Sequence, residues 1–597
     1  MFKLKSVAVV LFIIICISGT AVPQTLKDDW NDFLHYTKIG RFDLAKGYAQ
    51  AIIQSEPDPV ALLELSQQSQ TAFTLLKKVN ETAPDAQLSE LTGQILELIN
   101  EGRLLRHSDP VIIAEEIRRL TSTARGKITA VKRLRDSGEY AIPLMLDAMA
   151  DVLRKEELPN IIWALPQIGK DAIRPLVAAL QSEDVAIKAE IIKALGEIGY
   201  PHSLPYLKYV QENDSSEQLR SMAKKSIERL DPAALNISAA QLFYTLAENY
   251  YYYAASLAPA EEADFGNIWF WDPDGRRLIR REVADDYFNE LMAMRCCEWA
   301  LKADAGFGRA IGLWIAAFFK AESADLEMPE YFGAGHAEAI VYAVTAGPEY
   351  LQQALARAVK DNNAYVALDA VEALATNAGE KSLFYRVGTT QPLIDTLTFD
   401  DKAVRYSAAI AIAAAGPKNS FDESRFVVRN LAQALEEQPG QSSQESMLWD
   451  DQSADEYAFR AAQVMFQLAQ TQNPVIDLSA ALETLINATN DTRAPIQIFT
   501  ANILARLDNP EAQRAIAAMA LSENNPLDIR LAAFQSLVIS AKLNANMLSD
   551  ETIDAVYSLV SSEDIEPELR GAAAGAFGAL NLPSRKVKNL ILDQAKS

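Results

Sequence analysis

Cysteine is scarce in this chain of 597 residues, which contains only three. Two of them, Cys296 and Cys297, are adjacent, and a disulfide between neighbours would be strained because it prefers a larger Cα separation. Their setting in a helical, apolar pattern predicts small buried side chains rather than a nucleophile. These features exclude a small module stapled by disulfides, so the chain must rely on large cores of its own.

Histidine is also scarce, and the four residues present are scattered along the sequence. Metal sites need clustered ligands, and no cluster can be assembled from His35, His107, His202 and His336. The element His336-Ala-Glu338 also occurs in zinc deaminases, but the cysteine pair that completes such a site does not follow it. Nucleophile elbows, glycine-rich phosphate loops and dinucleotide fingerprints are absent. We therefore predict no catalytic residues, no metal and no cofactor.

Basic residues are in deficit, with 56 Lys and Arg against 80 Asp and Glu and a formal net charge of −24. Binding to nucleic acid requires clustered basic residues that neutralise phosphates, so this composition argues against a nucleic-acid partner. Adhesion to an anionic lipid surface is disfavoured for the same reason. The sequence instead has ordinary globular values of 49% hydrophobic and 23% charged residues, which exclude disorder over most of the chain.

Long apolar runs are limited to the beginning of the sequence. Lys3 and Lys5 precede an apolar stretch over residues 7–17, and small residues follow it up to Ala21. This layout is typical of a secretory signal peptide, and the stretch is shorter than the roughly 20 residues needed to span a bilayer. We expect cleavage after Ala21, an exported protein that is periplasmic or secreted, and no transmembrane segment in the mature chain.

The sequence does contain an internal repeat. Three segments begin at Gly138, Gly169 and Gly199, about 30 residues apart, and each has a proline shortly after its glycine. The residues between two such glycines form two apolar stripes with helical spacing. Two short helices cannot bury both stripes alone, so they must stack on neighbours of the same kind. We therefore predict an all-α fold, a curved α-solenoid of helical hairpins.

The second helix of a repeat carries a short signature. Asp184-Val-Ala-Ile-Lys188 and Asp401-Lys-Ala-Val-Arg405 share the pattern Asp-x-x-(Val/Ile)-(Arg/Lys), and in both a glycine lies 11 residues beyond the basic residue. This pattern resembles HEAT-like repeats, including the short variety found in phycobilisome lyases. The resemblance implies that Asp184 and Asp401 cap their helices and pair with the basic residue of a neighbouring repeat, the position of Lys188 and Arg405. The local sequence itself supports the capping part.

Two regions lack this signature. Residues 28–100 and 239–320 contain helix pairs similar to tetratricopeptide-type hairpins, with helices expected over 242–257 and 287–302 in the second region. Aromatic residues, a Pro-Asp-Gly turn and a further extended run predict one small β-hairpin insertion over 265–281. The predicted domains are a signal peptide (1–21), a tetratricopeptide-like region (22–107), a HEAT-like block (108–232), a tetratricopeptide-like region with the insertion (233–330), a HEAT-like block (331–437), an acidic loop or linker (438–455) and a C-terminal HEAT-like block (456–597).

Aromatic residues concentrate around the insertion. The run Tyr250 to Tyr253 occupies four successive helical positions, so these tyrosines cannot all face one core. Either the tyrosines and tryptophans pack on each other to seat the insertion, or they form a recognition surface beside a group of arginines. Such a surface would suit an acidic peptide, an anionic glycan or another carboxylate-rich partner. The second interpretation assigns partner binding to Trp269, Phe270, Trp271, Arg276, Arg277, Arg280, Arg281 and Tyr252.

The expected function follows from the fold rather than from a catalytic motif. We predict a non-enzymatic exported scaffold that binds a protein or peptide partner on the concave face of a helical solenoid. One alternative, implied by the resemblance to phycobilisome-lyase repeats, is a lyase-like or chaperone-type enzyme. Another is the capture of a glycan or peptide by the aromatic hairpin alone.

Overall fold

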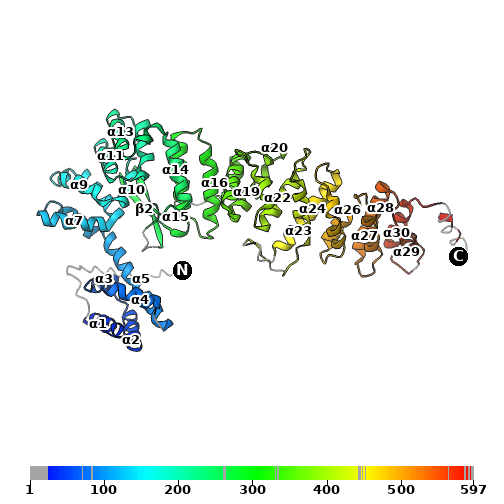
Figure 1. Ribbon diagram of the computed structural model, residues 1–597, viewed down its shortest axis with the longest axis horizontal. Coiled ribbons are helices and arrows are strands. Elements are labelled where there is room, and N and C mark those ends of the chain that lie inside the picture. The colour runs from blue at the N-terminus through cyan, green and yellow to red at the C-terminus, as the bar shows by residue number, and fades with distance from the viewer. Residues whose placement is uncertain are drawn as a thin grey trace, which may run out of the picture. The chain divides into compact units, whose positions relative to one another are not determined.

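The structure is a computed structural model. It describes residues 24–583 apart from 70, 83–84, 260–263, 330, 332–334, 441–445, 447, 451 and 563, together with residues 587, 588 and 592. The signal peptide predicted for residues 1–21 lies outside the described residues. The described chain is mostly helical and has one two-stranded sheet, which confirms the predicted fold class (Figure 1). No helix in this part of the chain has the length and hydropathy needed to cross a membrane.

The chain divides into two compact units. The first comprises Met1–Ala239 and Pro259–Ala284, and the second comprises Ala240–Ala258 and Asp285–Ser597. The β-hairpin therefore belongs to the first unit, although the helices that precede and follow it in sequence belong to the second.

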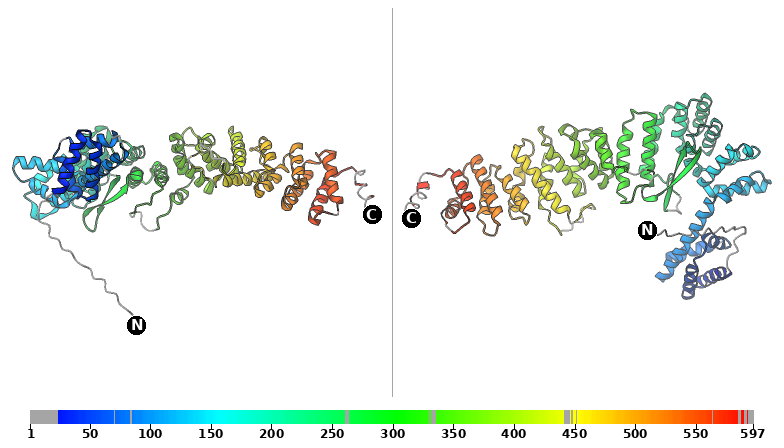
Figure 2. Two further views of the ribbon diagram at one scale, coloured as in Figure 1. Left: turned by 90° about the horizontal axis from the view of Figure 1, so that it is seen from below. Right: turned by 180° about the vertical axis from the view of Figure 1, so that it is seen from behind.

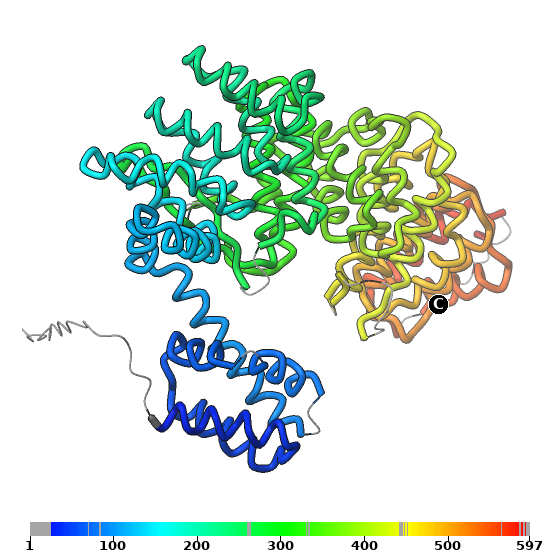
Figure 3. The backbone as a smooth tube through the Cα atoms, turned by 60° about the vertical axis from the view of Figure 1, so that its left-hand side comes forward, coloured from blue at the N-terminus to red at the C-terminus, as the bar shows by residue number. Residues whose placement is uncertain are grey.

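The first unit begins with five helices that pack around Trp30 and Phe33, both about 1% exposed. The carboxylates of Asp58 and Asp85 accept hydrogen bonds from backbone N–H groups of the following turn, which fixes where two of these helices begin. In Figure 3 the last and longest helix leads from this group towards the repeats. The helices are α1 (Gln24–Lys38), α2 (Phe42–Gln54), α3 (Pro59–Gln67), α4 (Ala72–Thr82) and α5 (Ala86–Ser108).

The next part of the first unit consists of short stacked helices. The periodic glycines Gly138, Gly169 and Gly199 all have positive φ, at 55°, 88° and 82°. Gly199 is a left-handed C-cap, a conformation that disfavours residues with a Cβ, and this explains why glycine recurs where the second helix of a repeat ends. The α-helices are α6 (Pro110–Arg119), α7 (Ala124–Ser137), α8 (Ala141–Ala150), α9 (Leu158–Ala164), α10 (Ile173–Ala179), α11 (Val185–Ile198), α12 (Leu204–Asn213) and α13 (Glu217–Leu230).

The hairpin consists of β1 (Phe265–Asp272) and β2 (Arg277–Ala284), which pair in antiparallel orientation. The second strand thus extends beyond residue 281, where the predicted insertion ended. Asp272 closes the turn because its Oδ1 accepts hydrogen bonds from the backbone N–H groups of Asp274 and Gly275, each at 3.1 Å. Both strands contact α10, and β2 also contacts α8, so the hairpin lies on the first helices of the repeats.

The second unit is a succession of helices that continues to the C-terminal end (Figure 2). Its later helices pack as hairpins in which each second helix contacts the next: α19 contacts α22, and the contacts continue through α24, α26 and α28 to α30. The helices are α14 (Ala239–Tyr251), α15 (Asp285–Ala303), α16 (Arg309–Glu322), α17 (Ala339–Ala346), α18 (Pro348–Asp361), α19 (Ala364–Asn377), α20 (Glu380–Leu383), α21 (Pro392–Asp395), α22 (Lys402–Ala415), α23 (Ser424–Glu436), α24 (Ser453–Thr471), α25 (Leu482–Ala488), α26 (Ala494–Leu504), α27 (Pro510–Leu521), α28 (Leu527–Asn544), α29 (Asp550–Ser561) and α30 (Pro567–Ala579).

The helix expected over residues 242–257 is shorter than predicted. It ends at Tyr251 because Tyr253 has a left-handed φ of 52° and the N–H of Ala254 donates to the carbonyl of Asn249. This hydrogen bond is that of a Schellman motif with tyrosine in place of the usual glycine. The four tyrosines therefore do not occupy successive helical positions.

Candidate functional site

The hairpin is anchored on the first unit by one of its predicted recognition residues. The indole Nε1 of Trp269 donates to Oε2 of Glu139 at 2.8 Å, and Nδ2 of Asn267 donates to Oε1 of the same carboxylate at 2.6 Å. Trp269 is 6% exposed, and Arg280, its partner across the strands, lies over the ring of Tyr140 at 4.7 Å. Trp269 and Arg280 thus face the scaffold, as packing residues do.

Other predicted recognition residues of the hairpin point elsewhere. Phe270 and Trp271 are half-buried, and Arg276 and Arg281 are exposed without an ion pair to any described residue. Arg277 lies 3.6 Å from the carboxylate of Asp272, within the turn. Phe270 and Trp271 point to opposite faces of the hairpin, and Trp271 shares the face of Trp269, so the exposed recognition residues of the hairpin are arginines.

Tyr252, the remaining predicted recognition residue, belongs to a different cluster in the second unit. Its hydroxyl accepts a hydrogen bond from Nη1 of Arg357 at 2.7 Å and donates to Oδ1 of Asp361 at 3.2 Å. Nη2 of the same arginine contacts the hydroxyl of Tyr244 at 2.9 Å and Oε1 of Glu248 at 2.7 Å. Arg357 thereby joins α14 to α18, and burial raises the pKa of Tyr252.

The neighbouring tyrosines surround a lysine. Nζ of Lys320 lies 4.4 Å from the ring centroid of Tyr251 and 3.9 Å from that of Tyr253. The hydroxyl of Tyr253 donates to Oε1 of Glu290 at 2.5 Å, and this carboxylate lies 3.4 Å from Lys320 Nζ. Burial lowers the pKa of Lys320 and raises those of Tyr251 and Tyr253. These contacts tie α14 to α15 and α16, so the tyrosine run has a structural role in its own unit.

The capping residues differ in part from what the resemblance implied. Asp184 accepts hydrogen bonds from the N–H groups of the first turn of α11, and Asp401 does the same for α22. Lys188, however, pairs with Asp214 of the following repeat. The repeat pattern predicts an aspartate at the N-cap of α13, but the N-cap residue is Ser216. Asp214 lies two residues earlier in the sequence. A search for the fixed spacing of the pattern therefore misses this aspartate.

Arg405 forms no ion pair with an aspartate of a neighbouring repeat among the residues that the structure describes. It donates instead to the backbone carbonyls of Phe399 and Asp400, at 2.7 and 2.8 Å. Oδ1 of Asp401 additionally accepts a hydrogen bond from Ser446 at 2.9 Å. In this repeat the basic residue therefore secures the turn before its own helix.

A charged contact joins three successive second helices of the second unit. Nη2 of Arg460 on α24 lies 2.9 Å from both carboxylate oxygens of Glu372 on α19, and Ser407 of α22, between them, donates to Glu372 at 2.7 Å. Arg460, Ser407 and Glu372 therefore lie on one side of α24, α22 and α19.

Aromatic residues continue this side onto the next helices. The ring of Phe499 on α26 lies 5.7 Å from those of Phe459 and Phe466 on α24, and the guanidinium of Arg506 lies 5.2 Å from Phe466. Phe459 is 42% exposed. We refer to this surface as the inner face, and it comprises Asp369, Glu372, Phe459, Arg460, Phe466, Phe499 and Arg506.

One residue of the inner face, Asp369, has a carboxyl group with a raised pKa. It lies on α19 one turn before Glu372, and burial together with the negative charges of Glu322 and Glu372 raises its pKa to about 7. The protonation of this group therefore changes near neutral pH. Sequence reasoning missed it because the opposing carboxylate, Glu322, belongs to a helix distant in sequence.

A tryptophan from the predicted acidic loop covers one end of α22. The indole of Trp449 stacks on Tyr457 with a centroid distance of 5.3 Å, and Nζ of Lys402 lies 3.6 Å from the indole centroid. Lys402 is 2% exposed and also donates to Oε1 of Glu437 at 2.8 Å. A single tryptophan in an otherwise polar segment was the available sequence signal for this contact.

Ligands suited to a metal do not gather anywhere in the part of the chain that the structure describes. Cys296 and Cys297 are fully buried, and burial raises the pKa of Cys297 well above its ordinary value. His336 packs against Phe318 and Tyr342 ahead of α17, where Glu338 is the N-cap.

Comparison with known proteins identifies the repeats of the first unit. A family model described as HEAT repeats matches residues 142–228, which include most of α8 to α13. These residues are similar to HEAT repeats, as the signature at Asp184 indicated, while the phycobilisome-lyase variety stays a prediction. No curated protein matches the sequence.

Several solved structures resemble the chain weakly. UNC-45 from Drosophila melanogaster is 13% identical with a TM-score of 0.32, over 93% of this chain and 78% of that protein. Kap95p, solved in a study of its binding to RanGDP, is 12% identical with a TM-score of 0.27, over 88% of this chain and 69% of that protein. An engineered protein is 14% identical with a TM-score of 0.22, over 85% of this chain and 99% of that protein. TM-scores of this size carry no conclusion about function.

Proposed function

We propose that this protein is a non-enzymatic scaffold that binds a protein partner on the inner face of its second unit. The observation that carries the proposal is the aromatic contact between the exposed Phe459 and the half-buried Phe499, beside the Arg460–Glu372 pair. Aromatic side chains and arginine supply much of the binding energy in protein interfaces, and the side of several stacked helices offers them a large contact area. The two phenyl rings are the expected anchors, and the charged pair forms part of the rim.

Site-specific photo-crosslinking tests this proposal. A photo-reactive side chain in place of Gln463, which is exposed on α24 between Phe459 and Phe466, should crosslink the partner in the native cell. The same group in place of Glu483, which is exposed on the first helix α25, serves as the matched control. A partner captured from Gln463 alone supports the inner face. Equal capture from both positions, or capture from Glu483 alone, contradicts it.

A double substitution then identifies the anchors. Phe459→Ala with Phe499→Ala should abolish the Gln463 crosslink and leave the helical circular dichroism unchanged, because Phe459 is exposed and Phe499 is half-buried. Retained crosslinking in this variant would show that the aromatic cluster is not the contact surface.

We further propose that the protein acts after export, in the periplasm or outside the cell. The proposal is supported by the arrangement of Lys3, Lys5 and the apolar residues 7–17. Expression of the full chain with a C-terminal tag, followed by fractionation and N-terminal sequencing, should give an exported product that begins at Val22. An intact N-terminus in the cytosolic fraction would contradict export.

The hairpin supports a second candidate function, capture of an acidic peptide or anionic glycan. Trp269 holds the hairpin in place, Trp271 is half-buried, and Arg276 and Arg281 are exposed. Trp271→Ala combined with Arg276→Gln should abolish binding of such a ligand without loss of helical circular dichroism. Binding that survives this change would assign recognition to the inner face.

A further inference from the structure

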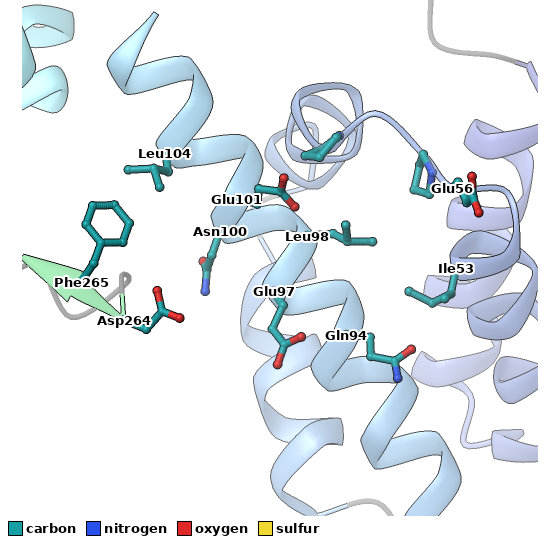
Figure 4. Close-up of a pocket in the computed structure, with 12 residues that line it drawn as sticks. Ile53, Glu56, Gln94, Glu97, Leu98, Asn100, Glu101, Leu104, Asp264 and Phe265 are labelled. Atoms are coloured by element: carbon teal, nitrogen blue, oxygen red, sulfur yellow. The ribbon is translucent and has the colours of Figure 1, made fainter. Parts of the chain in front are cut away.

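A groove of about 950 Å³ lies within the first unit, on a surface that the sequence analysis did not single out. It is bordered by the α2–α3 connection, by α5 and by the beginning of β1. Figure 4 shows Leu104 and Asn100 of α5 on the side of Phe265 and Asp264, and Leu98 on the side of Ile53.

The apolar part of the groove is held in a fixed position. Leu98, Leu104 and Phe265 are each half-buried, so they keep part of their surface open to a ligand. Gly102 of α5 approaches the start of α3 so closely that an added Cβ would lie 2.1 Å from the carbonyl oxygen of Pro59. This close approach fixes α5 against α3, and the lining side chains are therefore pre-organised.

The polar part of the groove is strongly acidic. Glu56, Glu97, Glu101 and Asp264 are exposed, and none of their carboxylates has a hydrogen bond or ion pair to a described residue. No lysine or arginine lines the groove among the residues that the structure describes. Unpaired carboxylates produce a negative electrostatic potential in the groove. The net charge of −24 on the whole chain adds a negative potential at longer range.

The spacing of two of these carboxylates matches an extended chain. Glu97 and Glu101 are four residues apart on α5, which places them on one face about 6 Å apart along the helix axis. In an extended peptide, alternate side chains point the same way about 6.6 Å apart. Two lysines separated by one residue can therefore meet Glu97 and Glu101, while the apolar residue between them points away from α5, where β1 supplies Phe265.

We propose that this groove binds a cationic peptide segment in which lysine or arginine alternates with apolar residues. The carboxylates favour a ligand with positive charge. The half-buried apolar side chains favour a ligand that also has apolar groups, which a bare cation lacks. A polyanion such as nucleic acid is repelled by the four carboxylates. The groove is separate from the inner face, so this proposal does not depend on the proposed function.

Fluorescence anisotropy with a labelled Lys-Leu-Lys-Leu-Lys peptide tests the proposal on the purified protein. We expect saturable binding that weakens with added salt, and no binding of Glu-Leu-Glu-Leu-Glu. A Lys-Ser-Lys-Ser-Lys peptide should bind about tenfold more weakly, because it cannot bury apolar side chains. Absence of binding of the first peptide, or equal binding of the leucine and serine peptides, would overturn the proposal.

Paired charge variants locate the site. Glu97→Gln with Glu101→Gln should weaken binding at least about fivefold, since both unpaired charges on α5 are lost. Asp28→Asn with Glu81→Gln removes the same net charge from exposed positions on α1 and α4 outside the groove, and should change binding less than about twofold. Equal weakening in both variants would show that only the overall field attracts the peptide. No change in either variant would place the peptide elsewhere, and both outcomes contradict the groove.

Discussion

Nε1 of Trp269 donates a hydrogen bond to Oε2 of Glu139 at 2.8 Å, although 130 residues of sequence separate the two. The same carboxylate accepts from Asn267 through its other oxygen, so one glutamate holds two consecutive inward-facing residues of β1. Glu139 follows Gly138, the first of the periodic glycines, and the hairpin is therefore fixed to the beginning of a repeat.

This relationship predicts graded losses of local stability. Trp269→Phe removes the indole hydrogen bond and part of the ring volume and should cost about 1–3 kcal/mol, whereas Trp269→Ala removes the whole ring system and should cost about 3–5 kcal/mol. Hydrogen exchange of the β1 amides measures both, because exchange reports local opening. Trp271→Ala is the control. Because Trp271 is only half-buried, the β1 amides of this variant should stay nearly as protected from exchange as those of the wild type. A larger effect at Trp271 than at Trp269 would contradict this assignment of the anchor.

Asp369 predicts a pH dependence of stability with a definite sign. Its pKa is about 7 in the folded protein and is raised from 3.8, so the folded state binds the proton more tightly than the unfolded state. This contribution to the free energy of unfolding is complete below about pH 4 and is lost as the pH rises through 7. Asp369→Asn cannot ionise and should gain stability relative to the wild type between pH 5 and pH 8, by roughly 1–4 kcal/mol.

Urea denaturation of the wild type and of Asp369→Asn at pH 5 and pH 8 gives the difference between their free energies of unfolding at each pH. Other groups that titrate in this range are present in both proteins, so their contributions cancel in this difference. Asp422→Asn, at an exposed position in the same unit, is the matched control and should show a difference independent of pH. A constant difference for Asp369→Asn would mean that the carboxyl group is already ionised at pH 5.

Alanine is expected to change local stability in opposite directions at a glycine with positive φ and at a glycine inside a helix. Gly199→Ala forces a Cβ into the left-handed conformation at φ 82° and should destabilise the end of α11 by about 1 kcal/mol. Gly571→Ala should instead stabilise α30 by about 0.5–1 kcal/mol, because Gly571 is inside the helix and an added Cβ meets nothing within 4 Å. Local hydrogen exchange in α11 and α30 measures both effects. A change in local stability of the same sign in both helices would contradict this prediction.

The adjacent cysteines are predicted to be unreactive in the native protein. Both are 0% exposed, and burial raises the pKa of Cys297, so the thiolate that reacts with a disulfide reagent is scarce. Titration with such a reagent should detect neither thiol until denaturant is added, and both afterwards. Rapid native labelling of either cysteine would indicate an accessible thiolate and would reopen the question of a chemical role.

Sequence periodicity was sufficient for the local architecture. The recurring glycines have the positive φ that their spacing indicated, and the residues around Asp184 and Asp401 begin helices as their side chains predicted. The end of α14 was missed because tyrosine, rather than glycine, adopts the left-handed conformation at residue 253. A residue type that rarely takes such a conformation gives no local signal for a helix end.

Partnerships between distant residues were not predictable from this single sequence. Glu139 with Trp269, Arg460 with Glu372 and Trp449 with Lys402 each join segments whose separation is set by the stacking of the helices. An arginine or glutamate on an amphipathic helix has the same sequence pattern whether it is solvated or paired. The sequence alone therefore determined the helices, their caps and their stacking as repeats, because these depend on residues within one or two turns. Only the tertiary structure decided that Trp269 faces inward, that Glu372 meets Arg460, and that four carboxylates from three separate segments border one groove. Each of these depends on which surfaces meet after stacking.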